Sequence, residues 1–441
     1  MDAFLVGIAG LVLFLVLLVV GFPVALSLAL SSILGITAIL GIQPTLNFIS
    51  STLFVNGSSY SLSVIPLFVA MGLFATHIGA SEDAYDALVR WTGRVRGSLG
   101  VATIGACTLF GALTGSSIAT AVVFAKVSAP QMIRHGYDRR LSLGLVASSG
   151  AIGMLIPPSI LAIVYAAVTE EPIGALLLAG VGPGLVLAVC LAAAVIIVAI
   201  VQPAKMPAVT TLSTGWTDKI QSLTHLWHFI LVGVVVIGGI YGGVFTVTEA
   251  AAVGNAALLA LFLAKFGLTR KSWQTLVVVG LETAALTVTI FSIFIFAQLF
   301  TRFMVVSGIS QALTAAVVGA DPSPLALVVA GALLYVVLGC LIDTMSLVVV
   351  TVPLFLPAMI STGVDPIWFG MVLILASQIG LITPPVGMNL YVVKQIAGSG
   401  TTVHDVFVGC IPFLIASLVA LALVIAFPEI SLWLTRQQLF S

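Results

Sequence analysis

The sequence has very few charged residues. Asp, Glu, Lys and Arg together make up 7% of its 441 residues, whereas 61% are hydrophobic. A soluble domain usually carries about 25% charged residues, so a soluble globular protein is excluded. The fifteen basic residues balance the fifteen acidic ones, and no basic face occurs outside the short loops. This charge pattern argues against a nucleic-acid partner. The composition predicts an all-α polytopic protein embedded in a lipid bilayer.

The sequence also lacks the usual signatures of catalysis. Its five histidines have no metal-ligand spacing, and no nucleophile–base pair or glycine-rich phosphate loop stands out. The four cysteines lie inside apolar runs at unrelated spacings, which predicts buried thiols rather than a disulfide framework. The N-terminus lacks the basic region of a cleavable signal peptide, so residues 4–20 are expected to remain as a span. We therefore predict no enzyme and no organic cofactor.

Long apolar runs account for most of the chain. We interpret ten of them as membrane spans, at residues 4–20, 22–41, 62–79, 140–168, 173–201, 227–246, 248–266, 275–300, 367–396 and 404–427. Two further stretches, 98–133 and 325–360, each contain two shorter runs around a polar tip. Runs shorter than about 20 residues suggest re-entrant segments, so both stretches are predicted to be helical hairpins. Residues 80–97 are amphipathic and suit a helix in the membrane interface.

The basic residues predict the orientation in the membrane. With the N-terminus outside, thirteen of the fifteen Lys and Arg residues lie on the cytoplasmic side, and only Arg302 and Arg436 lie outside. The positive-inside rule favours this arrangement. Both termini are then expected on the outer side. The first hairpin would enter from the cytoplasm and the second from the opposite face.

The chain contains an internal repeat at an offset of 227 residues. Identical residues in this register include Pro130/Pro357, Gly136/Gly363, Asp138/Asp365, Gly153/Gly380, Pro157/Pro384 and Pro158/Pro385. The predicted topology makes the two copies cross the membrane in opposite senses. We predict a first inverted repeat at 1–202, a cytoplasmic linker at 203–226 and a second repeat at 227–441. Paired interrupted segments of this kind point to a transporter with its site near the membrane midplane.

Each repeat offers the same two elements for binding, a hydroxyl-bearing hairpin tip and a helix broken at a Pro-Pro pair. Proline removes an amide donor and clashes with the preceding turn, which frees backbone carbonyls from the helix. Sodium is a hard cation that prefers oxygen ligands. The candidate sodium ligands are Gly115, Ser116, Ser117, Gly153, Pro157, Asp343, Thr344, Ser346, Gly380, Thr383 and Pro384. Helix N-termini at the same tips would favour a carboxylate substrate.

Other roles are open for the polar residues of these segments. Ser and Thr in membrane helices usually bond to their own backbone or join helices. An acid in the middle of a hairpin is costly and by default functional, so Asp343 is a sodium ligand, a protonation site or a residue facing a water-filled vestibule. Glu249 can cap a helix, and Lys126 can extend to the cytoplasmic interface.

Several motifs resemble the large membrane subunit (DctM-like) of tripartite ATP-independent periplasmic (TRAP) transporters, over essentially the whole chain. They include FGALTGSS at 110–117, IPPS at 156–159, YGGVFTVTEA at 241–250, GCLID at 339–343 and GLITPPVGMN at 380–389. The chain departs from that family at Val247, where proline is common, and at Lys126, where small residues are common. Asn389 ends the last motif and joins Ser116, Ser117 and Ser159 as a candidate substrate residue.

The resemblance implies an elevator-type secondary transporter of the ion-transporter superfamily kind, driven by a sodium gradient. It also implies a bacterial inner-membrane location, a separate four-span small subunit and a periplasmic substrate-binding protein that delivers an organic acid. Two alternatives remain. A stand-alone sodium- or proton-coupled dicarboxylate symporter would share the inverted repeat but need no binding protein. A channel is a weaker alternative, because a continuous pore does not require two discontinuous half-sites.

Overall fold

The structure is a computed structural model that describes residues 2–93, 95–209, 215–224 and 226–438. Helices dominate these ranges, and the one β-bridge among them joins Arg96 to Ala208. The elements of the first half are α1 (Ala3–Val20), α2 (Val24–Leu40), α3 (Ile42–Gly57), η1 (Tyr60–Ser63), α4 (Val64–His77), α5 (Ala80–Thr92), α6 (Ser98–Thr114), α7 (Ser117–Arg134), α8 (Arg139–Ser149), η2 (Gly150–Met154), α9 (Ile160–Thr169) and α10 (Ile173–Val201).

The remaining elements follow the segment after α10. They are α11 (Trp216–Thr224), α12 (Trp227–Val232), the π-helical turn η3 (Gly233–Gly238), α13 (Gly239–Tyr241), α14 (Val247–Phe266), α15 (Arg270–Val306), α16 (Ile309–Gly319), α17 (Pro324–Gly339), α18 (Thr344–Ser361), α19 (Pro366–Leu381), α20 (Met388–Ala397), α21 (Val403–Ala426) and α22 (Glu429–Gln438). Within the described residues, six helices are long and apolar enough to cross a membrane, or up to eight if each of two bent pairs is one span. The prediction of an all-α multi-pass membrane protein is confirmed.

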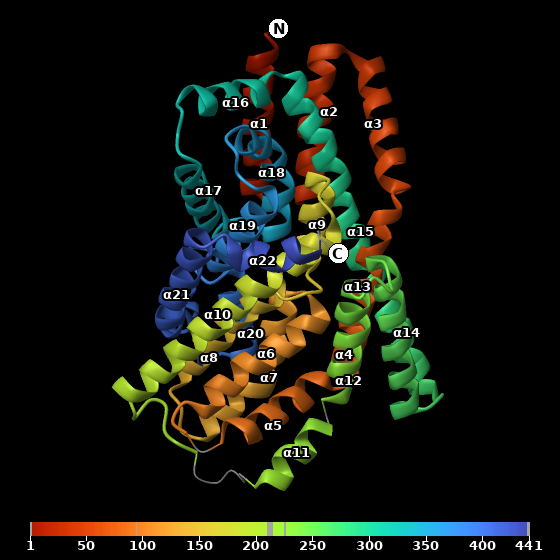
Figure 1. The fold of residues 1–441 in the computed structure, drawn as a ribbon. Helices are drawn as coiled ribbons and strands as arrows, with labels where there is room; N and C mark the ends of the chain where they lie inside the picture. The colour runs from red at the N-terminus through yellow and green to blue at the C-terminus, as the bar shows by residue number, and fades with distance from the viewer. Residues whose placement is uncertain (1, 94, 210–214, 225, 439–441) are drawn as a thin grey trace.

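The outer helices pack through small residues. α15 lies against α2, α2 against α1, and α14 against α4 (Figure 1). The ring of Phe303 fills the gap at the first of these contacts. A Cβ atom built on Gly10 of α1 or Gly35 of α2 would lie 2.4 or 2.2 Å from that ring. Glycine at these positions therefore lets α1 and α2 approach α15 closely, as small residues do in membrane helices.

The interrupted helices form the buried centre together with α6, α7 and α18, whereas α17 keeps exposed apolar residues such as Leu333 and Val337. Every residue of α8 from Leu141 to Ser149 is buried, and so are the five residues of η2. From Trp368 onward α19 is buried as well. Figure 1 shows the α6–α7 hairpin in the lower half of the molecule and the α17–α18 hairpin in the upper half. Their tips thus approach the middle from opposite ends.

The element bounds repeat at the offset found in the sequence. Adding 227 to the bounds of α7 gives 344–361, which are the bounds of α18. Adding 227 to the combined range of α8 and η2, 139–154, gives 366–381, the bounds of α19. The matched parts are the second arm of each hairpin and the first part of each interrupted helix. Both Pro-Pro bonds, Pro157–Pro158 and Pro384–Pro385, are cis.

Three helices have no counterpart among the predicted elements: α3, α16 and α22. In α3 seven polar residues interrupt the apolar pattern, although Ile42 and Phe54 are largely exposed on its surface. The predicted interfacial segment 80–97 contains α5, which meets α4 at an angle of 64° and packs against α6. The predicted linker 203–226 contains α11. Residues 210–214 and 225 of that linker lie outside the described part of the chain.

Candidate functional site

The first hairpin turns at Gly115. α6 ends at Thr114, and Gly115 adopts a left-handed conformation with φ of 59°. Ser116 then caps α7, because its hydroxyl oxygen accepts a hydrogen bond from the amide of Ala119 at 3.3 Å. A side chain at Gly115 is excluded for a second reason. Its Cβ would lie 2.4 Å from the carbonyl oxygen of Pro158. The hairpin tip and the first Pro-Pro loop are therefore in direct contact.

The first interrupted helix opens between η2 and α9. Proline at positions 157 and 158 leaves the carbonyls of Gly153 and Met154 without the amide that would lie four residues later in a helix. Ser159 closes the gap from the other side. Its hydroxyl donates to the carbonyl of Met154 and accepts from the amide of Ala162, which caps α9. The carbonyl of Gly153 therefore lacks the amide partner that an uninterrupted helix would provide.

The second hairpin has an acid where the first has a serine. Asp343 caps α18, accepting from the amide of Ser346 at 3.0 Å and from the Ser346 hydroxyl. Asp343 and Ser116 differ by 227 residues, so they occupy equivalent helix N-termini. A carboxylate at such a position is favoured by the helix dipole. The equivalent positions share geometry but differ in charge.

The second break packs against the second tip as closely as the first break packs against the first tip. A Cβ on Gly380 would lie 2.5 Å from the carbonyl carbon of Gly339. The amide of Val386, just after the Pro-Pro pair, donates to the carbonyl of Cys340 at 3.2 Å. Thr383 bonds its own helix, with its hydroxyl donating to the carbonyl of Ile379 at 2.7 Å. Tip and break are therefore in direct contact in this half too.

Asn389 links the two halves. Its amide nitrogen donates to the hydroxyl of Ser117 at 2.9 Å and to the carbonyl of Ala147 at 3.2 Å. Asn389 comes from α20 in the second half, whereas both acceptors belong to α7 and α8 in the first. All of Asn389 and Ser117 is buried. A residue proposed from sequence as a substrate contact therefore also joins the two half-sites.

Several buried polar atoms near the breaks have no hydrogen-bond partner among the described residues. They are the hydroxyls of Ser148, Ser149 and Thr344, both amide atoms of Gln378, and the side-chain oxygen of Asn389. A buried polar atom left unpaired costs about 1–3 kcal/mol, so such atoms need an explanation. Sequence reasoning missed Ser148, Ser149 and Gln378. Their position in the sequence could have identified them as candidate site residues, because each lies in an apolar run within five residues of Gly153 or Gly380.

A cavity of ≈ 470 Å³ lies between the two hairpin tips and the outer helices. Ser116 and Thr114 reach it from the first tip, and Asp343 and Thr344 from the second. α4 and α15 supply the opposite wall, which is mostly apolar. Asp343 is the charged residue among the described side chains that line it. Three of the four candidate substrate residues, Ser117, Ser159 and Asn389, lie outside this lining and are fully buried.

The oxygen atoms at this site suit a hard cation rather than a transition metal. The described residues contain no group of three or more His, Cys, Asp or Glu side chains that could hold a metal ion. The two half-sites instead offer hydroxyls, backbone carbonyls and one carboxylate, which are ligands preferred by hard cations. The N-termini of α7 and α18 face the same cavity and carry partial positive charge, which favours an anion.

The fold has counterparts among solved structures. The Alcanivorax borkumensis YdaH transporter resembles it with a TM-score of 0.59 and 16% identity, over 89% of each chain. The Neisseria gonorrhoeae efflux pump MtrF resembles it with a TM-score of 0.56 and 14% identity, over 88% of this chain and 85% of its own. At such identities the likeness concerns the fold.

The sequence comparisons then identify the family. Residues 11–430 match the model of the tripartite ATP-independent periplasmic transporter DctM component, so the chain belongs to that family. The C4-dicarboxylate TRAP transporter large permease protein of Pseudomonas aeruginosa is 36% identical over 92% of this chain and 93% of its own length. The ectoine TRAP transporter large permease protein of Halomonas elongata is 32% identical, covering 95% and 96%.

A further relative is longer than this chain. The isethionate TRAP transporter permease protein DctMQ of Oleidesulfovibrio alaskensis is 30% identical, over 88% of this chain and 60% of its own length. The resemblance inferred from the motifs is confirmed. These relatives are permease proteins rather than enzymes, in agreement with the lack of catalytic motifs.

Proposed function

We propose that this chain is the large permease subunit of a TRAP transporter that takes up an organic acid together with sodium ions. The observation that carries this proposal is the meeting of two hairpin tips and two Pro-Pro breaks around one cavity. Family membership supports the permease role, and the substrates in the relatives' names support an organic acid. The unpaired oxygens of Thr344 and Asn389 support a cation held by the two half-sites.

The sodium ions and the substrate are assigned different parts of the site. The carbonyl of Gly153 with Ser116 and Ser117 would hold sodium in the first half, and Asp343, Thr344 and the Gly380 segment in the second. The acid would occupy the cavity between the tips. Because that cavity is lined by one acid and no described Lys or Arg, the bound sodium and the helix N-termini would offset the charge of the carboxylate.

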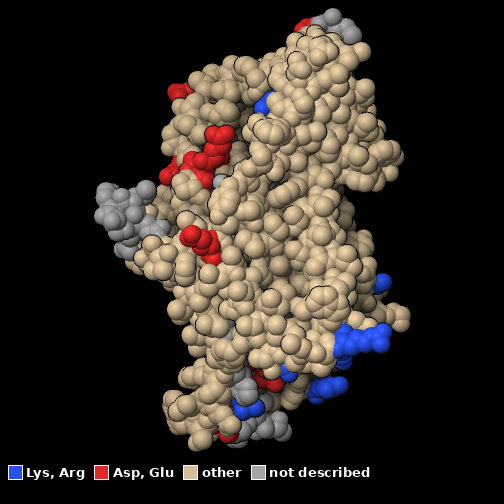
Figure 2. All heavy atoms as spheres, turned by 90° about the vertical axis from the view of Figure 1, so that its right-hand side faces the viewer, with Lys and Arg blue, Asp and Glu red and all other residues tan. Residues whose placement is uncertain are grey.

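We further propose that transport follows an elevator movement of the buried centre along the outer helices. Support comes from the close contact between each tip and its break, and from the separate wall that α4 and α15 form on the other side of the cavity. The repeat of element bounds at 227 residues supports two inverted copies, at 1–202 and 227–441. Figure 2 shows Lys and Arg side chains gathered at the lower end of the molecule, as expected if that end faces the cytoplasm.

The permease is proposed to work in the bacterial inner membrane with both termini on the periplasmic side. Its partners would be a small four-span membrane subunit and a periplasmic binding protein. The longer DctMQ relative supports the first partner, since this chain covers 60% of it. The alternative is a symporter that needs no binding protein.

Reconstitution distinguishes these two functions. Proteoliposomes containing this chain and its small subunit are assayed for uptake of a panel of organic acids, with and without the cognate binding protein. Uptake of one acid that requires the binding protein is expected. Equal uptake without the binding protein would instead establish the stand-alone symporter, and the absence of uptake for every acid would contradict both.

A further inference from the structure

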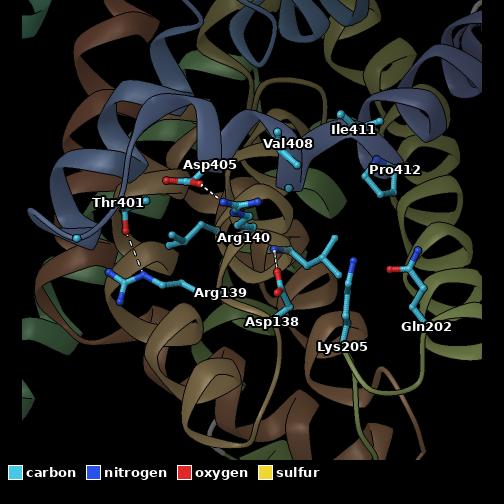
Figure 3. Close-up of a pocket in the computed structure, with 14 residues that line it drawn as sticks. Asp138, Arg139, Arg140, Gln202, Lys205, Thr401, Asp405, Val408, Ile411 and Pro412 are labelled. Carbon is cyan, nitrogen blue, oxygen red and sulfur yellow. Dashed lines mark hydrogen bonds and ion pairs between the residues drawn. The ribbon is translucent and has the colours of Figure 1, made fainter.

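A second cavity lies at the basic end of the molecule, away from the hairpin tips. It measures ≈ 680 Å³ and is bounded by the first turn of α8, the segment after α10 and the first turns of α21. Figure 3 shows Lys205 and Gln202 extending side by side toward α21, across from Ile411 and Pro412. None of its lining residues belongs to the proposed transport site.

The acids of this cavity already have partners. Asp405 forms an ion pair with Arg140 at 2.8 Å and also accepts from Thr402 in a capping box. Asp138 caps α8 by accepting from the amide of Leu141 at 3.0 Å. Each carboxylate therefore has a structural role at the start of a helix.

The positive charges exceed the negative ones. Arg139 donates to two neutral oxygens, the hydroxyl of Thr401 at 3.0 Å and the carbonyl of Ala397 at 2.8 Å. The side chain of Lys205 has no hydrogen-bond or ion-pair partner within the described residues. The cavity thus holds Arg139, Arg140 and Lys205 against two carboxylates. The excess charge favours an anionic ligand beside Lys205.

The wall of the cavity continues into a lipid-facing surface. Ile411, Ile415 and Leu418 of α21 are 41%, 57% and 44% exposed. Their spacing of four and three residues places them on one face of the helix. Because α21 is long and apolar enough to span a membrane, this face is expected to contact acyl chains. Ile411 belongs to both the cavity and the apolar stripe, so the two surfaces are continuous.

We propose that this cavity binds an anionic phospholipid, with the headgroup phosphate beside Lys205 and Arg140 and an acyl chain along the α21 stripe. Basic pockets between membrane helices on the cytoplasmic side are typical sites for anionic headgroups. A soluble phosphate would leave the adjoining apolar stripe unused. The bound lipid would connect α8, the segment after α10 and α21, all at the base of the buried centre.

Lipid binding to the purified protein tests this inference without any transport assay. The protein in detergent is titrated with phosphatidylglycerol or with zwitterionic phosphatidylcholine, and bound lipid is counted by native mass spectrometry. Lys205→Gln removes one charge from an exposed side chain that has no partner to lose. We expect it to weaken phosphatidylglycerol binding about fivefold, equivalent to about 1 kcal/mol, and to leave phosphatidylcholine binding unchanged.

A matched control separates this site from general attraction to the membrane surface. Lys271 lies exposed in the first turn of α15, outside the cavity. Lys271→Gln is expected to leave phosphatidylglycerol binding unchanged. The inference is overturned if the two variants behave alike, if wild-type protein binds both lipids equally, or if inorganic phosphate displaces phosphatidylglycerol at equal concentration.

Discussion

Replacing Asp343 by asparagine separates its charge from its structural role. Both residues are good helix N-caps, so Asp343→Asn should keep α18 capped through the Ser346 amide, now 3.0 Å from the carboxylate. What the substitution removes is the negative charge facing the cavity. Hydrogen bonds and contacts to charged groups are worth about 1.5–3 kcal/mol, compared with about 1 kcal/mol for neutral ones. Because asparagine keeps a neutral oxygen, the loss is the difference of about 0.5–2 kcal/mol, and the apparent affinity for sodium should fall by up to about 30-fold.

The assay is the sodium dependence of uptake in proteoliposomes, measured at matched protein content. Asp365→Asn is the control, because Asp365 caps α19 in the same way, through the amides of Ile367 and Trp368, but does not line the cavity. Ser116→Ala removes a neutral oxygen and should raise the sodium requirement by a smaller factor, about fivefold, with residual transport. Sodium dependence close to wild type in Asp343→Asn would remove this residue from the mechanism.

Three further predictions concern topology, packing and pH. A cysteine placed at His135 should react with an impermeant reagent from the cytoplasmic side, and one at Ser361 from the periplasmic side; the opposite pattern would reverse the orientation. Gly380→Ala should abolish folding or transport, because its Cβ would lie 2.5 Å from backbone atoms. Gly280→Ala should be tolerated, because its Cβ would have no neighbouring atom within 4 Å. Equal melting temperatures for the two variants would contradict the close packing at Gly380. Burial, with a smaller effect from a nearby acid, raises the pKa of Glu171 in the loop before α10. The charged carboxylate is therefore less favourable in the folded state than in the unfolded state. Glu171→Gln should raise the melting temperature at pH 8 and leave it unchanged at pH 4; a lower melting temperature of the variant at pH 8 would contradict this.

The elements of the site could be predicted from the sequence because proline and glycine act locally. Pro157 and Pro384 remove backbone donors wherever they stand, so the two breaks follow from the residue types alone. The offset of 227 residues between them likewise needs no structure, and the bounds of α7 and α18 follow it.

The contacts between these elements could not be predicted in the same way. The bond from Asn389 to Ser117 joins residues 272 positions apart, and no spacing rule connects them. Gln378 is a single polar residue in an apolar helix. Which residues surround its side chain becomes apparent only when α19 is packed in the fold. Helix α3 was not predicted because polar residues interrupt its apolar pattern. The exposed apolar residues on its surface are apparent only in the structure.

The sodium requirement tests the central claim most directly. Proteoliposomes containing the complete transporter are given the transported acid with an inward sodium gradient, or with potassium in place of sodium and an inward proton gradient. The two oxygen-rich half-sites with one carboxylate between them predict uptake in the first condition and only background in the second. Equal uptake in both conditions would contradict sodium coupling and leave the half-sites without the role proposed for them.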